Sequence, residues 1–450
     1  MNEATSTKTL SQQAKLTILA VAFLAWFFGG MQILLTNLGM RPASIDLMGQ
    51  VGMIDLPEFN ALTSRARELV GEEAAQLEVW RGSVNKWYAW FQCAFLFGAA
   101  FGGYFFGKLG DRIGRTRALG LSIILFASMT GVCYFAASPM KLLVLRFLAC
   151  LGVGGAWPNS VALVSEVWAN KSRPLLASMI GMAGNLGIFA MSTMAKIRPV
   201  VPEDWKWMIT VNAIPVALGI YILLFVRESE AWREAYSNAS KDSEEDTAKE
   251  SLLNPKYLWV TLVGIVLATV PLMGGWGSAN WMMPWAGDVG SELGDNTLQA
   301  NVGMARSLTS IVGSLFAGLI AVRLGRRLVY FVTSLGALIV AQYAFWFSTP
   351  ADSSFLPLVA ALGIFNGVYF GWLPFFLPEL FPTRIRSTGA GVSFNFGRIF
   401  TAVTLFATGH LVEVFQKDYA QIGRTTSVIF LIGMIAICFA PDTSKRDMQQ

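Results

Sequence analysis

A ten-residue pattern that occurs twice in the chain constrains its fold more than any other feature. Each copy has one acid followed by two basic residues: Glu166, Lys171 and Arg173 in SEVWANKSRP, and, 213 positions later, Glu379, Arg384 and Arg386 in PELFPTRIRS. Each copy lies between two long apolar, glycine-rich segments. Two copies of a unit with several apolar segments predict a membrane protein built from two related halves.

A second motif is repeated at nearly the same distance. GKLGDRIGRTR, from Gly107 to Arg117, is followed 211 residues later by VRLGRRL, in which Arg323, Gly325 and Arg326 match Arg112, Gly114 and Arg115. We expect Gly107 and Gly110 to let the second and third helices approach closely. Asp111 is expected to lie at the positive end of the third helix and to pair with a nearby arginine. In the second copy its position is Val322, so the acid is lost there.

The composition is that of a helical membrane protein. Hydrophobic residues make up 54% of the chain and charged residues only 14%, whereas soluble domains carry about 25% charged residues. The net charge of +5 is small and unevenly distributed, which argues for membrane orientation and against nucleic-acid binding. The chain has no nucleophile–base arrangement, phosphate-binding loop or set of metal ligands. We therefore expect neither an enzyme nor a cofactor.

Twelve apolar segments are long enough to cross a bilayer, for which about 20 residues are needed. We expect them near 16–38, 87–107, 118–137, 142–165, 174–195, 206–226, 257–284, 298–321, 328–348, 355–378, 388–411 and 424–441. The expected fold is all-α, with two pseudo-symmetric six-helix bundles. The N-terminal bundle would cover 1–226, a charged linker 227–255, and the C-terminal bundle 256–450.

Basic residues are concentrated in alternate loops between these segments. They are Lys108, Arg112, Arg115, Arg117, Lys171, Arg173, Arg323, Arg326, Arg327, Arg384 and Arg386. Loops rich in Lys and Arg face the cytoplasm, so we expect both termini on the cytoplasmic side of the cell membrane, that is, the inner or plasma membrane. Residues 40–86 then form a long outer loop, with helical potential between Leu62 and Trp80.

These motifs resemble those of the major facilitator superfamily. GKLGDRIGRTR resembles the signature loop between helices 2 and 3 of that family, and Arg146 in RFLACLGVGGAWPNS matches its helix 4 pattern of an arginine followed by a glycine run. PELFPTRIRSTGAG resembles the loop after helix 10 in sugar porters and in metabolite:proton symporters, including sialate and aromatic-acid carriers. The resemblance covers essentially the whole chain and implies a transporter that works by alternating access.

The resemblance also implies a gate. In that family the paired loops form salt bridges that hold the cytoplasmic side closed when the cavity opens outward. Arg146 is, by the same resemblance, a structural or coupling candidate. The gate residues implied are Gly107, Asp111, Arg112, Gly114, Arg115, Glu166, Arg173, Glu379 and Arg386.

Charged residues inside apolar segments point to a substrate site, because each is costly in a membrane unless it is used or paired. Arg398 lies about 11 residues into its segment, or roughly 16 Å at the rise of a helix, and Arg306 about eight residues, or roughly 12 Å. Either guanidinium could bind a carboxylate, or could instead only hold helices together. Asn185 occupies the repeat position of Arg398 and should face the same cavity. The remaining binding candidates are Asn395, Gln32 and Trp281.

The first segment, 16–38, contains no Asp or Glu, although many proton-coupled members of the resembled branch carry a carboxylate there. We therefore expect weak dependence on a proton gradient, with a co-transported proton left open, and an anionic substrate. The predicted function is transport of a small polar metabolite, such as a sugar acid or another carboxylate, by a monomer in the lipid bilayer. A neutral-sugar carrier and a transporter-like nutrient sensor are the alternatives. Retention of both gate loops favours a carrier over a sensor.

Overall fold

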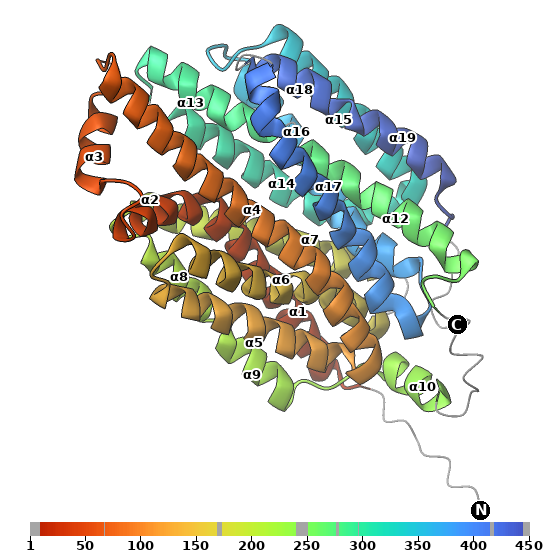
Figure 1. The fold of residues 1–450 in the computed structure, drawn as a ribbon. Helices are drawn as coiled ribbons and strands as arrows, with labels where there is room; N and C mark the ends of the chain where they lie inside the picture. Colours follow the sequence, from red (N-terminus) through yellow and green to blue (C-terminus); the bar gives the residue numbers. More distant parts are fainter. Residues whose placement is uncertain are drawn as a thin grey trace, which may run out of the picture.

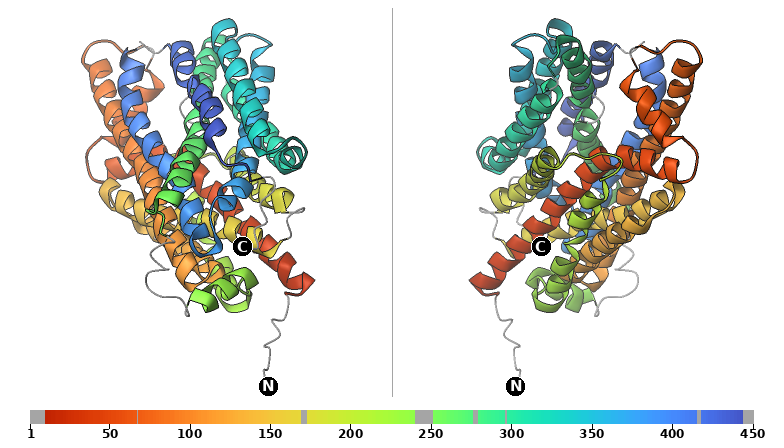
Figure 2. Two further views of the ribbon diagram at one scale, coloured as in Figure 1. Left: turned by 90° about the vertical axis from the view of Figure 1, so that its right-hand side faces the viewer. Right: turned by 90° about the vertical axis from the view of Figure 1, so that its left-hand side faces the viewer.

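The computed structural model describes residues 10–66, 68–168, 173–239, 251–275, 279–295, 297–414 and 418–443. Within these ranges the chain forms helices and no β-strand. Figures 1 and 2 show two bundles of long helices, one from the first part of the chain (red to yellow) and one from the second part (green to blue). The all-helical fold with two bundles agrees with the sequence-based prediction.

The helices of the N-terminal bundle begin at recognisable caps. The Oγ of Ser11 accepts from the N–H of Ala14, and the Oγ of Ser138 accepts from Lys141 next to a proline at the first helical position. The elements are α1 (Gln12–Leu34), the π-helical turn η1 (Leu35–Gly39), α2 (Met40–Gln50), α3 (Leu56–Ser64), α4 (Glu72–Ile113), α5 (Arg115–Val132), η2 (Cys133–Phe135), α6 (Pro139–Val167), α7 (Arg173–Ile197), α8 (Lys206–Ala213) and α9 (Val216–Phe225).

The linker contributes a short helix before the C-terminal bundle begins. There, the Asn254 side chain caps the next helix and Pro255 occupies its first position. The elements are α10 (Glu230–Ala239) in the linker, then α12 (Pro255–Met273), η4 (Ala279–Trp281), α13 (Met282–Leu293), α14 (Leu298–Leu324), α15 (Arg326–Phe347), α16 (Phe355–Glu379), η5 (Thr383–Ile385), α17 (Arg386–Val414), α18 (Tyr419–Ser427) and α19 (Ile429–Phe439).

The expected membrane spans are largely recovered. In the described part of the chain, 11 helical segments are long and apolar enough to cross a membrane. The remaining expected span, 388–411, falls in α17, whose 29 residues are also long enough. One span differs in its helical geometry: residues 257–284 are expected to be continuous, but α12 ends at Met273 and Gly274 and Gly275 are π-helical. Pro271 lacks the N–H that a regular α-helix needs here, and glycine weakens a helix.

The segment 40–86, which we expect to form an outer loop, is largely helical. It consists of α2, α3 and the first turns of α4, a helix that begins before residue 87. These helices enclose a small apolar core of their own, which includes Met48, Phe59 and Leu77. The indole of Trp205 donates to Asp46 of α2 over 2.8 Å and ties this cap to the bundle below it. The buried side chains are spread through the whole cap, and their burial stabilises its helices.

The two bundles meet mainly where α4 packs against α17 and where α7 packs against both α14 and α16. Figure 1 shows α4 and α17 side by side along much of their length. Backbone atoms approach closely at this boundary: a Cβ atom on Gly181 would lie 1.9 Å from the carbonyl oxygen of Phe370, and one on Gly391 would lie 2.4 Å from that of Gly103. Glycines therefore set the separation of the bundles.

We predict that the cap formed by α2 and α3 lies outside the cell and the linker inside. A cysteine introduced at the exposed Ser64, in a protein whose exposed Cys438 is replaced by serine, should react with an impermeant reagent in intact cells. A cysteine at the exposed Ser251 should react only after the cells are opened. The opposite pattern would reverse the orientation.

Candidate gate and substrate-binding site

Two buried glutamates form the centre of an ion-pair network at the ends of α6 and α16. Glu166 Oε1 lies 3.1 Å from Arg115 Nη2 in its own bundle and 3.3 Å from Arg386 Nη1 in the other bundle. Glu379 Oε1 lies 3.4 Å from Arg326 Nη2 in its own bundle and 2.8 Å from Arg173 Nη2 in the other.

The two halves of this network are equivalent under the sequence repeat. Each acid binds one arginine of its own bundle and one arginine of the opposite bundle, and both glutamate side chains are fully buried. Buried ion pairs gain little net free energy, but losing one partner leaves a charge stranded, at a cost of about 3–5 kcal/mol. The network is therefore satisfied only while the two bundles are in contact at this end.

A further pair of hydroxyl groups completes the network. Ser229 donates to Glu166 Oε2, and Thr443 donates to Glu379 Oε2. Each hydroxyl lies just after the last long helix of its bundle, three residues beyond the helix-capping residues Val226 and Ala440. Both carboxylates thus have partners for each of their oxygens.

Asp111 connects the bundles in a different way. Its Oδ1 accepts from the backbone N–H of Ser387 at 3.1 Å and its Oδ2 from that of Thr388 at 2.9 Å, and Arg115 Nη1 lies 3.0 Å from Oδ1. These N–H groups belong to the first turn of α17, where the helix dipole favours a negative charge. The carboxylate is at a positive helix end as we expected, but that helix is α17 of the other bundle. Asp111 itself lies near the end of α4.

Gly107 and Gly110 also serve the contact between bundles. We expected them to let the second and third helices approach. Instead, a Cβ atom on Gly107 would lie 2.9 Å from the carbonyl oxygen of Ser387, and one on Gly110 would lie 1.9 Å from Oδ1 of Asn159 and 3.2 Å from the Ser387 hydroxyl. Asn159 in turn accepts from that hydroxyl at 2.9 Å. The expectation was wrong in its partner because the first turn of α17 occupies this position.

Of two other expected gate residues, Gly114 is needed for the local backbone geometry, and Arg112 has no hydrogen bond or ion pair with the described residues of the network. Gly114 separates α4 from α5 with a φ of +106°, and a Cβ atom there would lie 2.1 Å from Glu228 Oε2, so both its backbone and its surroundings require glycine. Arg112 is exposed and has no ion pair or hydrogen bond with the described residues. In this conformation Arg112 does not join the network.

Several members of the network were not included in our sequence-based set. They are Arg326, Ser387, Thr388, Asn159, Glu228, Ser229 and Thr443. Arg326 could have been found from the repeat, since it matches Arg115. The acid–hydroxyl pairs Glu228–Ser229 and Asp442–Thr443 recur after the last helix of each half and could also have been recognised. The backbone N–H groups of Ser387 and Thr388 could not be recognised from the sequence, because every residue except proline supplies one. Their hydroxyl groups also donate, to Asn159 and to Asp111.

Glu228 is a buried acid between α9 and α10. Its Oε2 accepts from the N–H of Thr116 and its Oε1 from that of Ser229, each at 3.0 Å. Burial raises the pKa of Glu228 above its ordinary value of 4.5; the charge of Glu166 also raises it, whereas Arg115 and the two N–H groups lower it. The ionised form is thus disfavoured while the network is closed.

Arg398 of α17 lies at the boundary between the bundles, well away from this network. Only 4% of its surface is exposed, and its guanidinium lies 5.2 Å from the ring centroid of Phe95 and 5.4 Å from that of Phe394. It makes no hydrogen bond or ion pair with any described residue. Phe95 and Asp111 are 16 residues apart on α4, or about 24 Å along the helix axis.

Aromatic rings from three other helices surround Phe394, one of the two rings beside this arginine. Phe394 stacks on Trp157 of α6 at a centroid distance of 3.9 Å, and the rings of Trp26 of α1 and Phe370 of α16 meet it edge-on at 6.2 and 6.5 Å. The result is an unneutralised cation bordered by aromatic surface. Such a site suits a carboxylate attached to a flat, apolar body.

The other predicted substrate-binding residues lie elsewhere and have partners. Asn395 donates to the carbonyl oxygens of Gly154 and Gly391 at 3.3 and 3.1 Å, although its own Oδ1 lacks a partner. Asn185 donates across the bundles to Ser314 at 3.1 Å. These two amides hold helices together in this conformation.

Arg306 and Trp281 lie near the break after α12. Arg306 Nη2 donates to the carbonyl oxygen of Gly275 over 3.2 Å, and Trp281 packs against Tyr419 with an indole N–H that is buried without an acceptor among the described residues. Arg306 is thus bound to a backbone carbonyl oxygen, whereas the contacts of Arg398 among the described residues are with aromatic rings.

Gln32 and Arg146 form a separate polar cluster inside the N-terminal bundle. Arg146 donates to Gln32 Oε1 at 3.0 Å and to the Thr36 hydroxyl at 2.8 Å, and Gln32 Nε2 donates to the Thr130 hydroxyl at 3.0 Å. Arg146 is completely buried. Its charge is thus held by neutral acceptors, which agrees with the structural role considered for it.

We predict that Asp111→Asn slows transport while leaving substrate affinity within a few-fold of the wild type. The substitution removes a charge that accepts two backbone N–H groups, and hydrogen bonds to charged groups are worth about 1.5–3 kcal/mol, or roughly a tenfold or greater change in an equilibrium. Transport rate and ligand affinity should be measured in the same purified protein. Arg112→Gln is the matched control and should change neither. An equal loss of binding and transport in folded Asp111→Asn protein would contradict the gate role.

We also predict that Glu228→Gln weakens the pH dependence of stability. An acid whose pKa is raised by folding destabilises the folded state as the pH rises through its ordinary value of 4.5, and an amide does not titrate there. The amide has a single acceptor oxygen, so the variant keeps only one of the two N–H hydrogen bonds and loses about 1–3 kcal/mol at every pH. Melting temperatures measured from pH 4.5 to neutral pH should therefore fall more steeply in the wild type than in the variant. Equal slopes in the two proteins would contradict the raised pKa of Glu228.

Comparisons with known proteins agree with this architecture. The sequence model described as Major Facilitator Superfamily matches residues 83–404. The chain is 29% identical over 329 residues to the cis,cis-muconate transport protein of Acinetobacter baylyi, covering 71% of this chain and 76% of that protein. It is 24% identical over 318 residues to the gentisate transporter of Corynebacterium glutamicum, covering 70% of each. The solved structure of the proton:xylose symporter XylE superposes with a TM-score of 0.66 at 17% identity, covering 97% of this chain and 98% of that one.

Proposed function

We propose a substrate for this chain, which belongs to the major facilitator superfamily and is a membrane transporter and not an enzyme. The substrate is a small carboxylate with a flat, unsaturated or aromatic body. The observation that carries this proposal is Arg398, a buried cation whose described neighbours are rings and not acids. A carboxylate would supply the missing counter-charge and accept two parallel N–H groups from the guanidinium.

Two further observations support an unsaturated body over a sugar acid. The rings of Phe95 and Phe394 border the guanidinium, and Trp157 stacks on Phe394. Stacking against these rings rewards a flat ligand, whereas the hydroxyl groups of a sugar need hydrogen-bond partners. In addition, two similar proteins are a muconate and a gentisate transporter by name. The likeness to XylE at 17% identity bears on the fold alone.

The proposed transport cycle uses the network between the bundles as the cytoplasmic gate. With Glu166 and Glu379 each shared by two arginines, the bundles are held together at one end while the other end opens. Release of substrate to the cytoplasm requires Arg386 and Arg173 to leave the opposite acids. A nutrient sensor would not need to break these pairs, which is why we favour a carrier. Weak dependence on a proton gradient, a monomeric state and cytoplasmic termini stay predictions.

We predict that Arg398→Ala lowers affinity for the carboxylate substrate by roughly 10- to 150-fold, the equivalent of about 1.5–3 kcal/mol for a charge-assisted contact. Arg398→Lys should restore little, because an ammonium cannot reproduce the planar fork. Binding of cis,cis-muconate and gentisate to purified protein is the measurement, with melting temperature as the check on folding.

Matched ligands separate the parts of this proposal. The wild type should bind each acid at least about tenfold more tightly than its methyl ester, which keeps the body and loses the charge, and it should prefer muconate to adipate, its saturated equivalent. In Arg398→Ala the difference between acid and ester should disappear while any preference for the flat body remains. If Arg398→Ala binds these acids as tightly as the wild type, the anion site is refuted. Binding of neutral sugars instead would favour a sugar carrier.

A further inference from the structure

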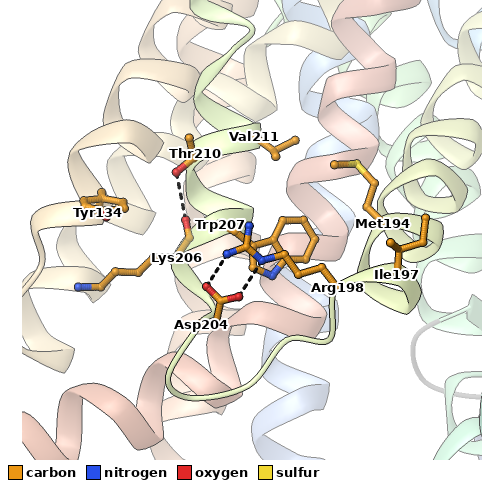
Figure 3. A pocket seen from close by; sticks show the side chains of 9 residues that line it. All are labelled: Tyr134, Met194, Ile197, Arg198, Asp204, Lys206, Trp207, Thr210 and Val211. Carbon is orange, nitrogen blue, oxygen red and sulfur yellow. Dashed lines mark hydrogen bonds and ion pairs between the residues drawn. The ribbon is translucent and has the colours of Figure 1, made fainter.

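A pocket of about 550 Å³ opens in the N-terminal bundle at the end opposite the gate. Figure 3 shows it between the end of α7, the start of α8 and Tyr134, which follows α5. Helices α5 and α7 begin at the gate, with Arg115 and Arg173, and end at this pocket. The pocket is therefore separated from the gate by the full length of two membrane-spanning helices.

The pocket opens onto an exposed, largely apolar face of the N-terminal bundle. Ile197 is 81% exposed at its rim, and Thr210 and Ile214 continue the exposed face of α8 that begins at Lys206. Residues four apart lie on one side of a helix, so this face runs from the pocket directly into an apolar surface. Exposed apolar side chains on a membrane-spanning helix contact acyl chains.

Charge is confined to one end of the pocket. Arg198 Nε and Nη2 pair with the two oxygens of Asp204 at 2.7 and 2.8 Å, as the dashed lines in Figure 3 show. Lys206 Nζ lies 5.5 Å from the ring centroid of Tyr134 and has no ion pair with a described residue. The remaining lining includes Met194, Ile197 and Val211, which are apolar. The pocket thus has a charged end with both signs and an apolar end.

A hydrogen-bond donor without an acceptor lies beside the charged end. Trp207 is 8% exposed, and its indole N–H has no partner among the described residues. Buried donors are normally satisfied, so an orphaned one marks a place where an acceptor is missing. Together with the ammonium of Lys206 and the N-terminal end of α8, this donor favours a phosphate group.

We propose that this pocket binds one phospholipid whose head group carries both a phosphate and a primary ammonium, as in phosphatidylethanolamine. The phosphate would lie against Lys206, the ammonium would donate to Asp204, and the acyl chains would follow the apolar wall towards Ile214. The charge pattern selects this head group. An anionic head group without an amine would face the carboxylate of Asp204, and a choline head group has no N–H to donate to it.

Such a lipid would add polar links among three helix ends that pack mainly through apolar side chains. Tyr134, Arg198 and Lys206 belong to different segments, and the only ion pair among them and the other pocket-lining residues in the described part of the chain is Arg198 with Asp204. The neighbouring Trp205 donates to Asp46 of the cap. Lipid binding would therefore stabilise the end of the bundle that carries the cap.

The test is lipid binding to delipidated protein in detergent, followed by native mass spectrometry. Phosphatidylethanolamine, its N-methylated and N,N-dimethylated forms, phosphatidylcholine and phosphatidylglycerol with identical acyl chains are the probes. We expect affinity to fall stepwise with methylation, by about two- to fivefold over the series, the range of an exposed ion pair. Lys206→Gln should weaken the binding of all of these lipids. Lys141→Gln, at an exposed position at the same end of the bundle, should weaken the binding of none.

The Asp204→Asn variant tests the head-group preference most directly. It should abolish the preference for phosphatidylethanolamine over phosphatidylcholine and increase binding of phosphatidylglycerol, because it frees Arg198 and removes the repelling charge. Equal binding of all the methylated forms by the wild type would overturn the proposal. So would an unchanged preference in Asp204→Asn, or a wild-type preference for phosphatidylglycerol, which would make this an anionic-lipid site.

Discussion

The structure depends on two glutamates that are each shared between an arginine of their own bundle and an arginine of the other. Glu166 and Glu379 are fully buried, so neither can exchange its partner for water without exposing the end of its helix. A buried acid with one arginine removed is far less stable than the complete set. In the transport cycle that we propose, the bundles would have two discrete arrangements: closed with the network complete, or open with all of its members hydrated. A device with two such states is what alternating access requires.

Two helices connect this network to the proposed substrate site. Helix α4 carries Asp111 at one point and Phe95 about 24 Å along its axis, and α17 carries Arg386 at its start and Arg398 twelve residues later, or about 18 Å away. Rigid helices that bear a gate residue and a ligand residue transmit a shift at one end to the other. Neutralisation of Arg398 by a carboxylate would remove a charge from the boundary along which the bundles must move.

The three membrane-embedded arginines differ in what surrounds the charge. Arg146 donates to Gln32 and Thr36, Arg306 donates to the carbonyl oxygen of Gly275, and Arg398 contacts only aromatic rings among the residues that the structure describes. A guanidinium with its hydrogen bonds satisfied inside the bundle contributes to packing, whereas one without an acceptor is prepared for a ligand. The positions of Arg398 and Arg306 deep within apolar segments made both of them candidates for substrate binding. Only the contacts around each guanidinium distinguish the two.

The sequence by itself determined the number and spacing of the apolar segments, the two-half organisation and the acids and arginines of the gate, because hydrophobicity, repeats and charge are local properties. It did not determine that 40–86 folds into a helical cap, that α12 ends at Met273, or that Gly107 and Asp111 face the first turn of α17. Two of the groups that Asp111 binds are backbone N–H groups, and every residue except proline supplies one, so no sequence pattern marks them. The tertiary structure decided these features because they depend on which helix lies opposite, and that is fixed only when the two bundles pack.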